Sequence, residues 1–166
     1  MTEDPISTRI SEESDQKLLV EWLLQPGVLH WFPLADLREI EDAARIWMSY
    51  IKQGAVLTAL WKGKPCGTAV LYLHPFRKLS KQSLFAIVVH EEFRGKGIGK
   101  RLLADLEGMA KNQFGIELLH LEVYQGNPAI RLYQRAGFVQ YGVQKRFIKE
   151  APGRYLDKIM MQKALI

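Results

Sequence analysis

The segment FRGKGIGKRLL, residues 93–103, decides how the chain around it folds. Its three glycines stand at alternate positions among basic residues, and an apolar pattern with helical spacing begins directly after them. The preceding segment SLFAIVVH, residues 83–90, is almost continuously apolar and rich in β-forming residues, which is typical of a strand buried on both faces. The sequence therefore predicts a strand, a glycine loop and a helix in direct succession.

Such a junction has the properties of an anion-binding site. Glycine permits positive φ angles and lets the backbone approach a ligand closely. Successive backbone N–H groups of the loop can converge on an anion, and the helix N-terminus adds partial positive charge. Arg94, Lys96 and Lys100 supply counter-charge. Together these features favour a pyrophosphate as the ligand.

Two common phosphate-binding patterns do not fit this loop. The dinucleotide fingerprint requires a small residue where Lys100 or Leu102 stands, and the P-loop requires Ser or Thr where Arg101 stands. What remains is the pattern R-x-x-G-x-G, formed by Arg94, Gly97 and Gly99. A glycine-rich strand-to-helix turn without a ligand would satisfy this short pattern as well, so both interpretations stay open.

Outward from the loop, strands and helices alternate, with no linker or repeat between them. We therefore expect one domain over residues 1–166, of the α/β or α+β class, with a mixed sheet covered by helices. The predicted strands are 7–10, 55–61, 66–73, 83–90, 116–124, 138–149 and 154–163, and the predicted helices are 12–24, 35–54, 98–113 and 128–137.

Composition excludes several classes of protein. The single cysteine, Cys66, excludes an internal disulfide and fits a reducing cytoplasm, where we expect the protein to reside. The polar N-terminus is not a secretory signal, and the chain has no apolar run long enough to span a membrane. The four histidines lack metal-ligand spacing, so no metal is expected. The net charge of +5 favours anionic partners, but no helix carries a basic stripe of the kind that binds nucleic acid.

Two longer motifs make the pattern specific. VVHEEFRGKGIGKRLL, residues 88–103, is followed by LHLEVYQGNPAIRLYQRAGF, residues 119–138. Together they resemble the GNAT superfamily of acyl-CoA-dependent N-acetyltransferases, most strongly over about residues 83–141. The resemblance implies a single-domain GNAT-like fold, with a mixed, mostly antiparallel sheet that is splayed in the middle and carries helices on both faces.

The resemblance also implies acetyl-CoA as cosubstrate, bound where strands 83–90 and 116–124 separate. Backbone groups near Val88 and Val89 would pair with the pantetheine arm, and Asn127 would contact the same arm. Tyr133 would lie beside the sulfur as general acid, unless it is a core aromatic residue. Asn127 precedes Tyr133 by six residues where many relatives have seven, so Gln125 is an alternative. The pyrophosphate would be held by Arg94, Gly95, Lys96, Gly97, Ile98, Gly99 and Lys100.

Glu122 is the candidate general base. Alternation along the strand places it on one face with His120 and Tyr124, opposite Leu119 and Leu121. A carboxylate there serves either as a base for the attacking amine or as a structural group bonded to backbone or to a buried cation.

The expected function is transfer of an acetyl group from acetyl-CoA to a primary amine of a small molecule, by direct attack in a ternary complex. Trp31 and Phe32 would line the acceptor pocket or else anchor their loop in the core. Exposed edges in the last hairpin are compatible with a homodimer. The alternatives are a CoA-binding sensor without turnover, an acetyltransferase acting on a protein N-terminus and, more remotely, a basic nucleic-acid-binding domain.

Overall fold

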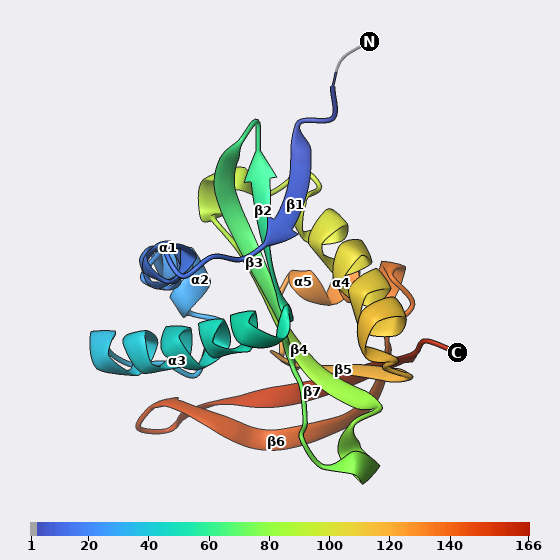
Figure 1. Ribbon diagram of the computed structural model, residues 1–166. Coiled ribbons are helices and arrows are strands. Elements are labelled where there is room, and N and C mark those ends of the chain that lie inside the picture. The colour runs from blue at the N-terminus through green and yellow to red at the C-terminus, as the bar shows by residue number, and fades with distance from the viewer. Residues whose placement is uncertain (1–2) are drawn as a thin grey trace.

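The computed structural model describes residues 3–166 and contains one seven-stranded sheet with the order β1-β2-β3-β4-β5-β7-β6 (Figure 1). Only β4 and β5 pair in parallel, and all other neighbours are antiparallel. The strands are β1 (Ile6–Ile10), β2 (Val56–Trp61), β3 (Lys64–Tyr72), β4 (Gln82–Val89), β5 (Leu118–Tyr124), β6 (Val139–Ala151) and β7 (Arg154–Ala164). The α-helices are α1 (Asp15–Leu23), α2 (Pro26–Leu29), α3 (Leu37–Ser49), α4 (Ile98–Phe114) and α5 (Ala129–Arg135). The predicted mixed, mostly antiparallel fold is confirmed.

Helices α1, α2 and α3 cover one face of the sheet (Figure 1). Their buried side chains, among them Leu19, Trp22 and Trp47, pack against Val56 of β2 and Val70 of β3. The sequence predicted that the first helix ends at Pro26, and α1 does end before it. Pro26 also opens α2, because its fixed φ suits the first helical position, where no N–H is needed. The short helix α2 was not predicted.

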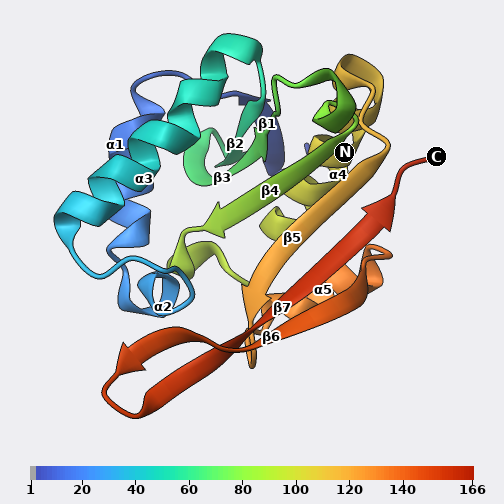
Figure 2. The ribbon, with the colours of Figure 1, turned by 90° about the horizontal axis from the view of Figure 1, so that it is seen from below.

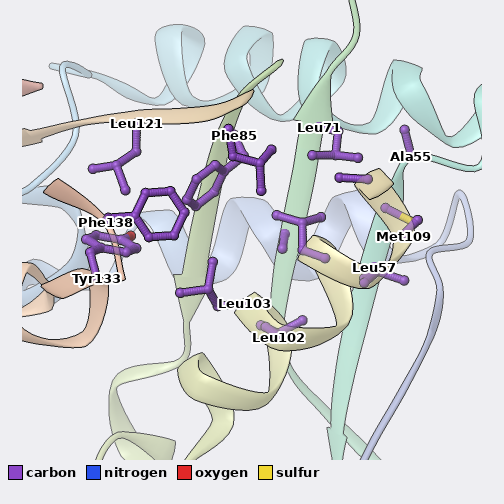
Figure 3. Packing of buried hydrophobic residues seen from close by; sticks show 14 of the residues in the cluster. Ala55, Leu57, Leu71, Phe85, Leu102, Leu103, Met109, Leu121, Tyr133 and Phe138 are labelled. Atoms are coloured by element: carbon purple, nitrogen blue, oxygen red, sulfur yellow. The ribbon is translucent and has the colours of Figure 1, made fainter. Parts of the chain in front are cut away.

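Helices α4 and α5 lie on the opposite side and enclose the second core with β3, β4 and β5. Figure 3 shows Leu102 and Leu103 of α4 facing Phe85 and Leu71, with Leu121, Tyr133 and Phe138 beside them. A Cβ atom at Gly99 would lie 3.1 Å from Leu132 Cδ2, so the glycine permits the close approach of α4 to α5.

Strands β4 and β5 separate after a short parallel ladder. Only Gln82–Leu84 pair with Leu118–His120, and Figure 2 shows the two strands diverging toward α2. Because β5 turns away, Ala86, Ile87 and Val89 stay only partly buried. The prediction that the whole strand is buried on both faces was therefore wrong, whereas the predicted splay is confirmed.

The last two strands form a long hairpin that extends beyond the rest of the sheet (Figure 2). Its outer strand β6 is one of the two edges of the sheet and is exposed along most of its length. Within residues 3–166, no helix is long and apolar enough to cross a membrane.

Candidate functional site

A cavity of about 1220 Å³ occupies the region where β4 and β5 separate. It extends from the glycine loop, along both strands, to the segment between α1 and α3 and to the last hairpin. It thus runs from a potential anion site to a mainly apolar end lined by aromatic side chains.

The glycine loop has the geometry that an anion requires. Gly95 and Gly97 adopt φ angles of 76° and 85°, in the left-handed region that favours glycine. Gly97 is the N-cap of α4 and provides no side-chain cap, and the first turn of the helix contains no acidic residue. The first N–H groups of α4 are therefore free to bind a ligand.

The charged residues predicted around the loop take different positions. Arg94 and Lys100 line the cavity, and the Arg94 guanidinium donates a hydrogen bond of 2.8 Å to the Gly27 carbonyl. This bond ties the loop to α2. The Lys96 ammonium instead lies 5.0 Å from the centre of the Trp61 ring, and Lys96 does not line the cavity. A direct side-chain contact from Lys96 to the ligand is therefore not supported.

The residues expected along the pantetheine arm all lie at the cavity. Val88, Val89 and Asn127 line it, as do Ile98 and Gly99 at the loop end. The Asn127 Oδ1 atom accepts a hydrogen bond of 2.9 Å from the Ala129 N–H at the start of α5, so its amide nitrogen is the part left for a ligand.

The alternative to Asn127 is not supported by its position. Gln125 does not line the cavity, and its side-chain oxygen accepts from the Asp157 N–H of β7. The Gln125 side-chain oxygen is therefore used in a hydrogen bond that links the end of β5 to β7.

Tyr133 lines the cavity from α5 with its ring in the core. It is 8% exposed and packs edge-on against Phe85 and Phe138 (Figure 3). Burial raises the pKa of its phenol to about 12. Tyr133 lines the cavity and no hydrogen bond joins its hydroxyl to another group of residues 3–166, so the O–H is available to a ligand.

Glu122 has a cationic partner that the sequence did not reveal. Its Oε1 atom lies 3.2 Å from the Lys158 ammonium of β7, whose side chain is 9% exposed, whereas Glu122 itself is 45% exposed. The carboxylate is therefore bonded to a nearly buried cation and also faces the cavity. The predicted alternation along β5 is confirmed, because Leu119, Leu121 and Val123 lie in the core on the other face.

The aromatic end of the cavity includes both predicted acceptor residues. Trp31 and Phe32 line it, and the Trp31 ring approaches within 4.0 Å of the position of a Cβ atom at Gly126, in the turn after β5. Sequence reasoning missed Lys158 and Phe147 of the last hairpin, which close the cavity from the other side. An isolated lysine in an exposed hairpin gives no signal of such a position.

The family model described as the Acetyltransferase (GNAT) family matches residues 18–138. The chain belongs to the GNAT family. The matched range includes β4, the glycine loop, α4, β5 and α5, which are the elements that form most of the cavity.

Curated GNAT relatives share the central part of the chain. A [ribosomal protein bS18]-alanine N-acetyltransferase from Haemophilus influenzae is 31% identical over 83 residues, which are 50% of this chain and 56% of that protein. An N-alpha-acetyltransferase from Saccharolobus solfataricus is 36% identical over 77 residues, which are 46% of each chain. The matched part of the chain thus spans about half the length of the curated relatives.

Solved GNAT structures match nearly the whole chain. YncA from Salmonella typhimurium, a putative acetyltransferase solved with its cofactor acetyl-CoA, matches with a TM-score of 0.82 at 22% identity. The match covers 98% of this chain and 95% of the YncA chain. A phosphinothricin acetyltransferase from Sinorhizobium meliloti, in complex with acetyl-CoA, has a TM-score of 0.80 at 23% identity, with 97% and 89% covered. At these identities the likeness shows a shared GNAT fold.

Proposed function

We propose that residues 1–166 act as one N-acetyltransferase domain, which transfers an acetyl group from acetyl-CoA to a primary amine of a small molecule. The observation that carries the proposal is the cavity between the diverging strands β4 and β5, with a helix N-terminus that has no side-chain cap at one end and Tyr133 in its lining. Membership of the GNAT family and the acetyl-CoA in related structures support this choice of cosubstrate.

Acetyl-CoA would occupy the cavity along its length. The N–H groups at Gly97, Ile98 and Gly99 would bind the pyrophosphate, with Arg94 and Lys100 as counter-charge. The edge of β4 that β5 leaves unpaired, near Val88 and Val89, would pair with the pantetheine amides. The thioester would then lie between β4 and β5, within reach of Tyr133.

The attacking amine must be neutral. An alkylamine with a pKa near 10.4 is mostly protonated at pH 7, and removing its proton costs about 4.6 kcal/mol. Glu122, half-exposed in the cavity, would accept this proton directly or through a water molecule. The ion pair with Lys158 orients the carboxylate.

The transfer then needs no covalent intermediate on the enzyme. The amine nitrogen bonds to the thioester carbon, the C–S bond breaks, and the departing sulfur takes a proton from the Tyr133 hydroxyl. Cys66 cannot serve as an acyl carrier, because it is fully buried and does not line the cavity. Burial also raises the pKa of its thiol to about 11, so it stays protonated at neutral pH.

The proposal also specifies the class of acceptor, a small-molecule amine. The aromatic end of the cavity has room for a small amine between Trp31 and the last hairpin. Curated relatives named for acetylating a ribosomal protein or protein N-termini favour an N-terminal peptide as the second candidate. The two candidates differ in whether the acceptor continues beyond the cavity.

The experiment is a CoA-thiol release assay with acetyl-CoA and two panels, one of small amines and one of short peptides with free N-termini. The proposal expects turnover on the small-amine panel, with the acetylated product identified by mass. Turnover on peptides alone would replace it with N-terminal acetylation. Acetyl-CoA binding without thiol release on either panel would indicate a CoA-binding sensor.

We also propose that two copies associate through the edge strand β6 in the cytoplasm. Val139, Tyr141 and Phe147 of β6 are exposed by 50–64%, and unpaired edge strands with apolar side chains favour pairing. Light scattering of the purified protein tests this, since a monomer at micromolar concentration would exclude it.

A further inference from the structure

The Tyr124 hydroxyl is a buried polar group without a hydrogen-bond partner. Tyr124 ends β5, lines the cavity and is 5% exposed, and its hydroxyl is fully buried and has no hydrogen-bond partner within residues 3–166. A buried hydroxyl without a hydrogen bond lowers the stability of the fold, which suggests that a bound ligand accepts the missing hydrogen bond.

Lys158 stands directly opposite Tyr124 in the β5–β7 ladder. Side chains of such a pair project from the same face with Cβ atoms about 5 Å apart. The Lys158 ammonium lies 3.9 Å from the centre of the Phe147 ring and 3.2 Å from Glu122. An ammonium has three donors, and Glu122 is its single side-chain polar contact in the described part of the chain, so it can donate to a further acceptor.

The charges around these two groups are balanced. Glu122 is paired with Lys158, and Glu150 of β6 is paired with Arg154 at 3.1 Å and lies 3.6 Å from His30. A ligand bearing only a positive charge would pair with Glu122 and leave the two donors unused. A zwitterion matches the site, because its anion meets Lys158 and Tyr124 while its ammonium meets Glu122.

We propose that the acceptor is a free α-amino acid with a large apolar side chain. Its carboxylate accepts hydrogen bonds from the Lys158 ammonium and the Tyr124 hydroxyl, and its amino group lies at Glu122, the proposed base. The aromatic rings of Trp31 and Phe147 contact its side chain. This inference rests on the proposed acetyltransferase function and names the acceptor class of the same site.

The first experiment compares acceptors that differ only in the carboxylate. L-phenylalanine, L-phenylalaninamide and phenethylamine are assayed with acetyl-CoA, as are L-leucine, L-leucinamide and isoamylamine. We expect kcat/KM to be at least about 10²-fold higher for each free acid, because an acceptor without the anion leaves both donors unpaired. Equal rates for acid, amide and amine would overturn the inference while leaving the acetyltransferase proposal intact.

The second experiment tests the two donors separately. Tyr124→Phe removes only the unpartnered hydroxyl, so it should leave the melting temperature unchanged or raise it, yet increase KM for L-phenylalanine by about 10- to 100-fold. Lys158→Met should raise KM for L-phenylalanine by a similar factor, and Lys158→Arg should raise it less, because the arginine keeps a cationic donor at this position. Lys149→Met and Tyr155→Phe, at positions of the same hairpin that do not line the cavity, are the matched controls and should change neither quantity. A Tyr124→Phe variant that melts lower with unchanged KM would assign the hydroxyl a structural role and refute the proposal.

A binding measurement separates the inference from the acetyltransferase function. Calorimetry of L-phenylalanine and phenethylamine with the CoA-loaded protein requires no turnover. Carboxylate-dependent binding that Tyr124→Phe weakens would support the acceptor site even if no thiol were released. Equal affinity for the two ligands would overturn it.

Discussion

Replacing Tyr133 with phenylalanine should slow acetyl transfer without disturbing the fold. The ring contacts with Phe85 and Phe138 persist, and the hydroxyl makes no hydrogen bond within the described chain, so stability should change by no more than about 0.5 kcal/mol. What is lost is the proton donor for the departing sulfur.

The size of the effect follows from the phenol's surroundings. General acids contribute about 10²- to 10⁴-fold to a rate. Burial raises the Tyr133 pKa from 10.0 to about 12, and two pKa units correspond to about 2.7 kcal/mol of lost acid strength. We therefore expect the lower part of the range, a fall in kcat of about 10²-fold, with little change in acetyl-CoA affinity.

The assay is steady-state thiol release with calorimetric measurement of acetyl-CoA binding. Tyr155→Phe, at a position on β7 that does not line the cavity, is the control and should behave as the parent protein. An unchanged kcat for Tyr133→Phe would remove this residue from the mechanism. A large loss of acetyl-CoA affinity would reassign it to cofactor binding.

Three further predictions address the loop, the thiol and the buried phenols. Gly97→Ala places a side chain at a left-handed φ of 85°, and although a Cβ atom has space there, the strained backbone should lower the free energy of unfolding by about 1–2 kcal/mol. The variant should also bind acetyl-CoA more weakly in calorimetry. The control Gly108→Ala, within α4, should stabilise the protein slightly. Cys66→Ala should keep kcat within about 2-fold if no acyl-enzyme forms, and a loss beyond 10-fold in a folded variant would contradict direct attack. Burial raises the pKa of Tyr72, Tyr124 and Tyr133, so the folded state retains phenol protons that the unfolded state loses above pH 10. The melting temperature should therefore fall as the pH rises from 10 toward 12. The fall should be less steep in Tyr133→Phe, which has one buried phenol fewer.

Much of the architecture could be predicted from local patterns. The glycine loop between an apolar strand and an amphipathic helix defined β4 and α4 within one or two residues. The alternation in β5 placed Glu122 and Tyr124 on the face opposite the core residues Leu119 and Leu121. These features depend on residues that are close together in the sequence, so the spacing of apolar and glycine residues is enough to predict them.

The remaining features depend on contacts between distant segments. The exposure of Ala86 and Val89 follows from where β5 stops pairing with β4, and no residue of β4 itself encodes that point. Lys158 pairs with Glu122 only because the β7 register sets it opposite Tyr124. The stacking of Lys96 on Trp61 likewise depends on how the β2–β3 turn approaches the loop. Sequence reasoning found the loop but not these partners.

The most direct test of the central claim is thermal unfolding with and without saturating acetyl-CoA. Ligand at about 100 times its dissociation constant adds roughly 2.7 kcal/mol of stability, which for a domain of this size raises the melting temperature by about 5–11 °C. We expect a rise of this order. No rise in a protein that unfolds cooperatively would contradict the assignment of the cavity between β4 and β5 to acetyl-CoA.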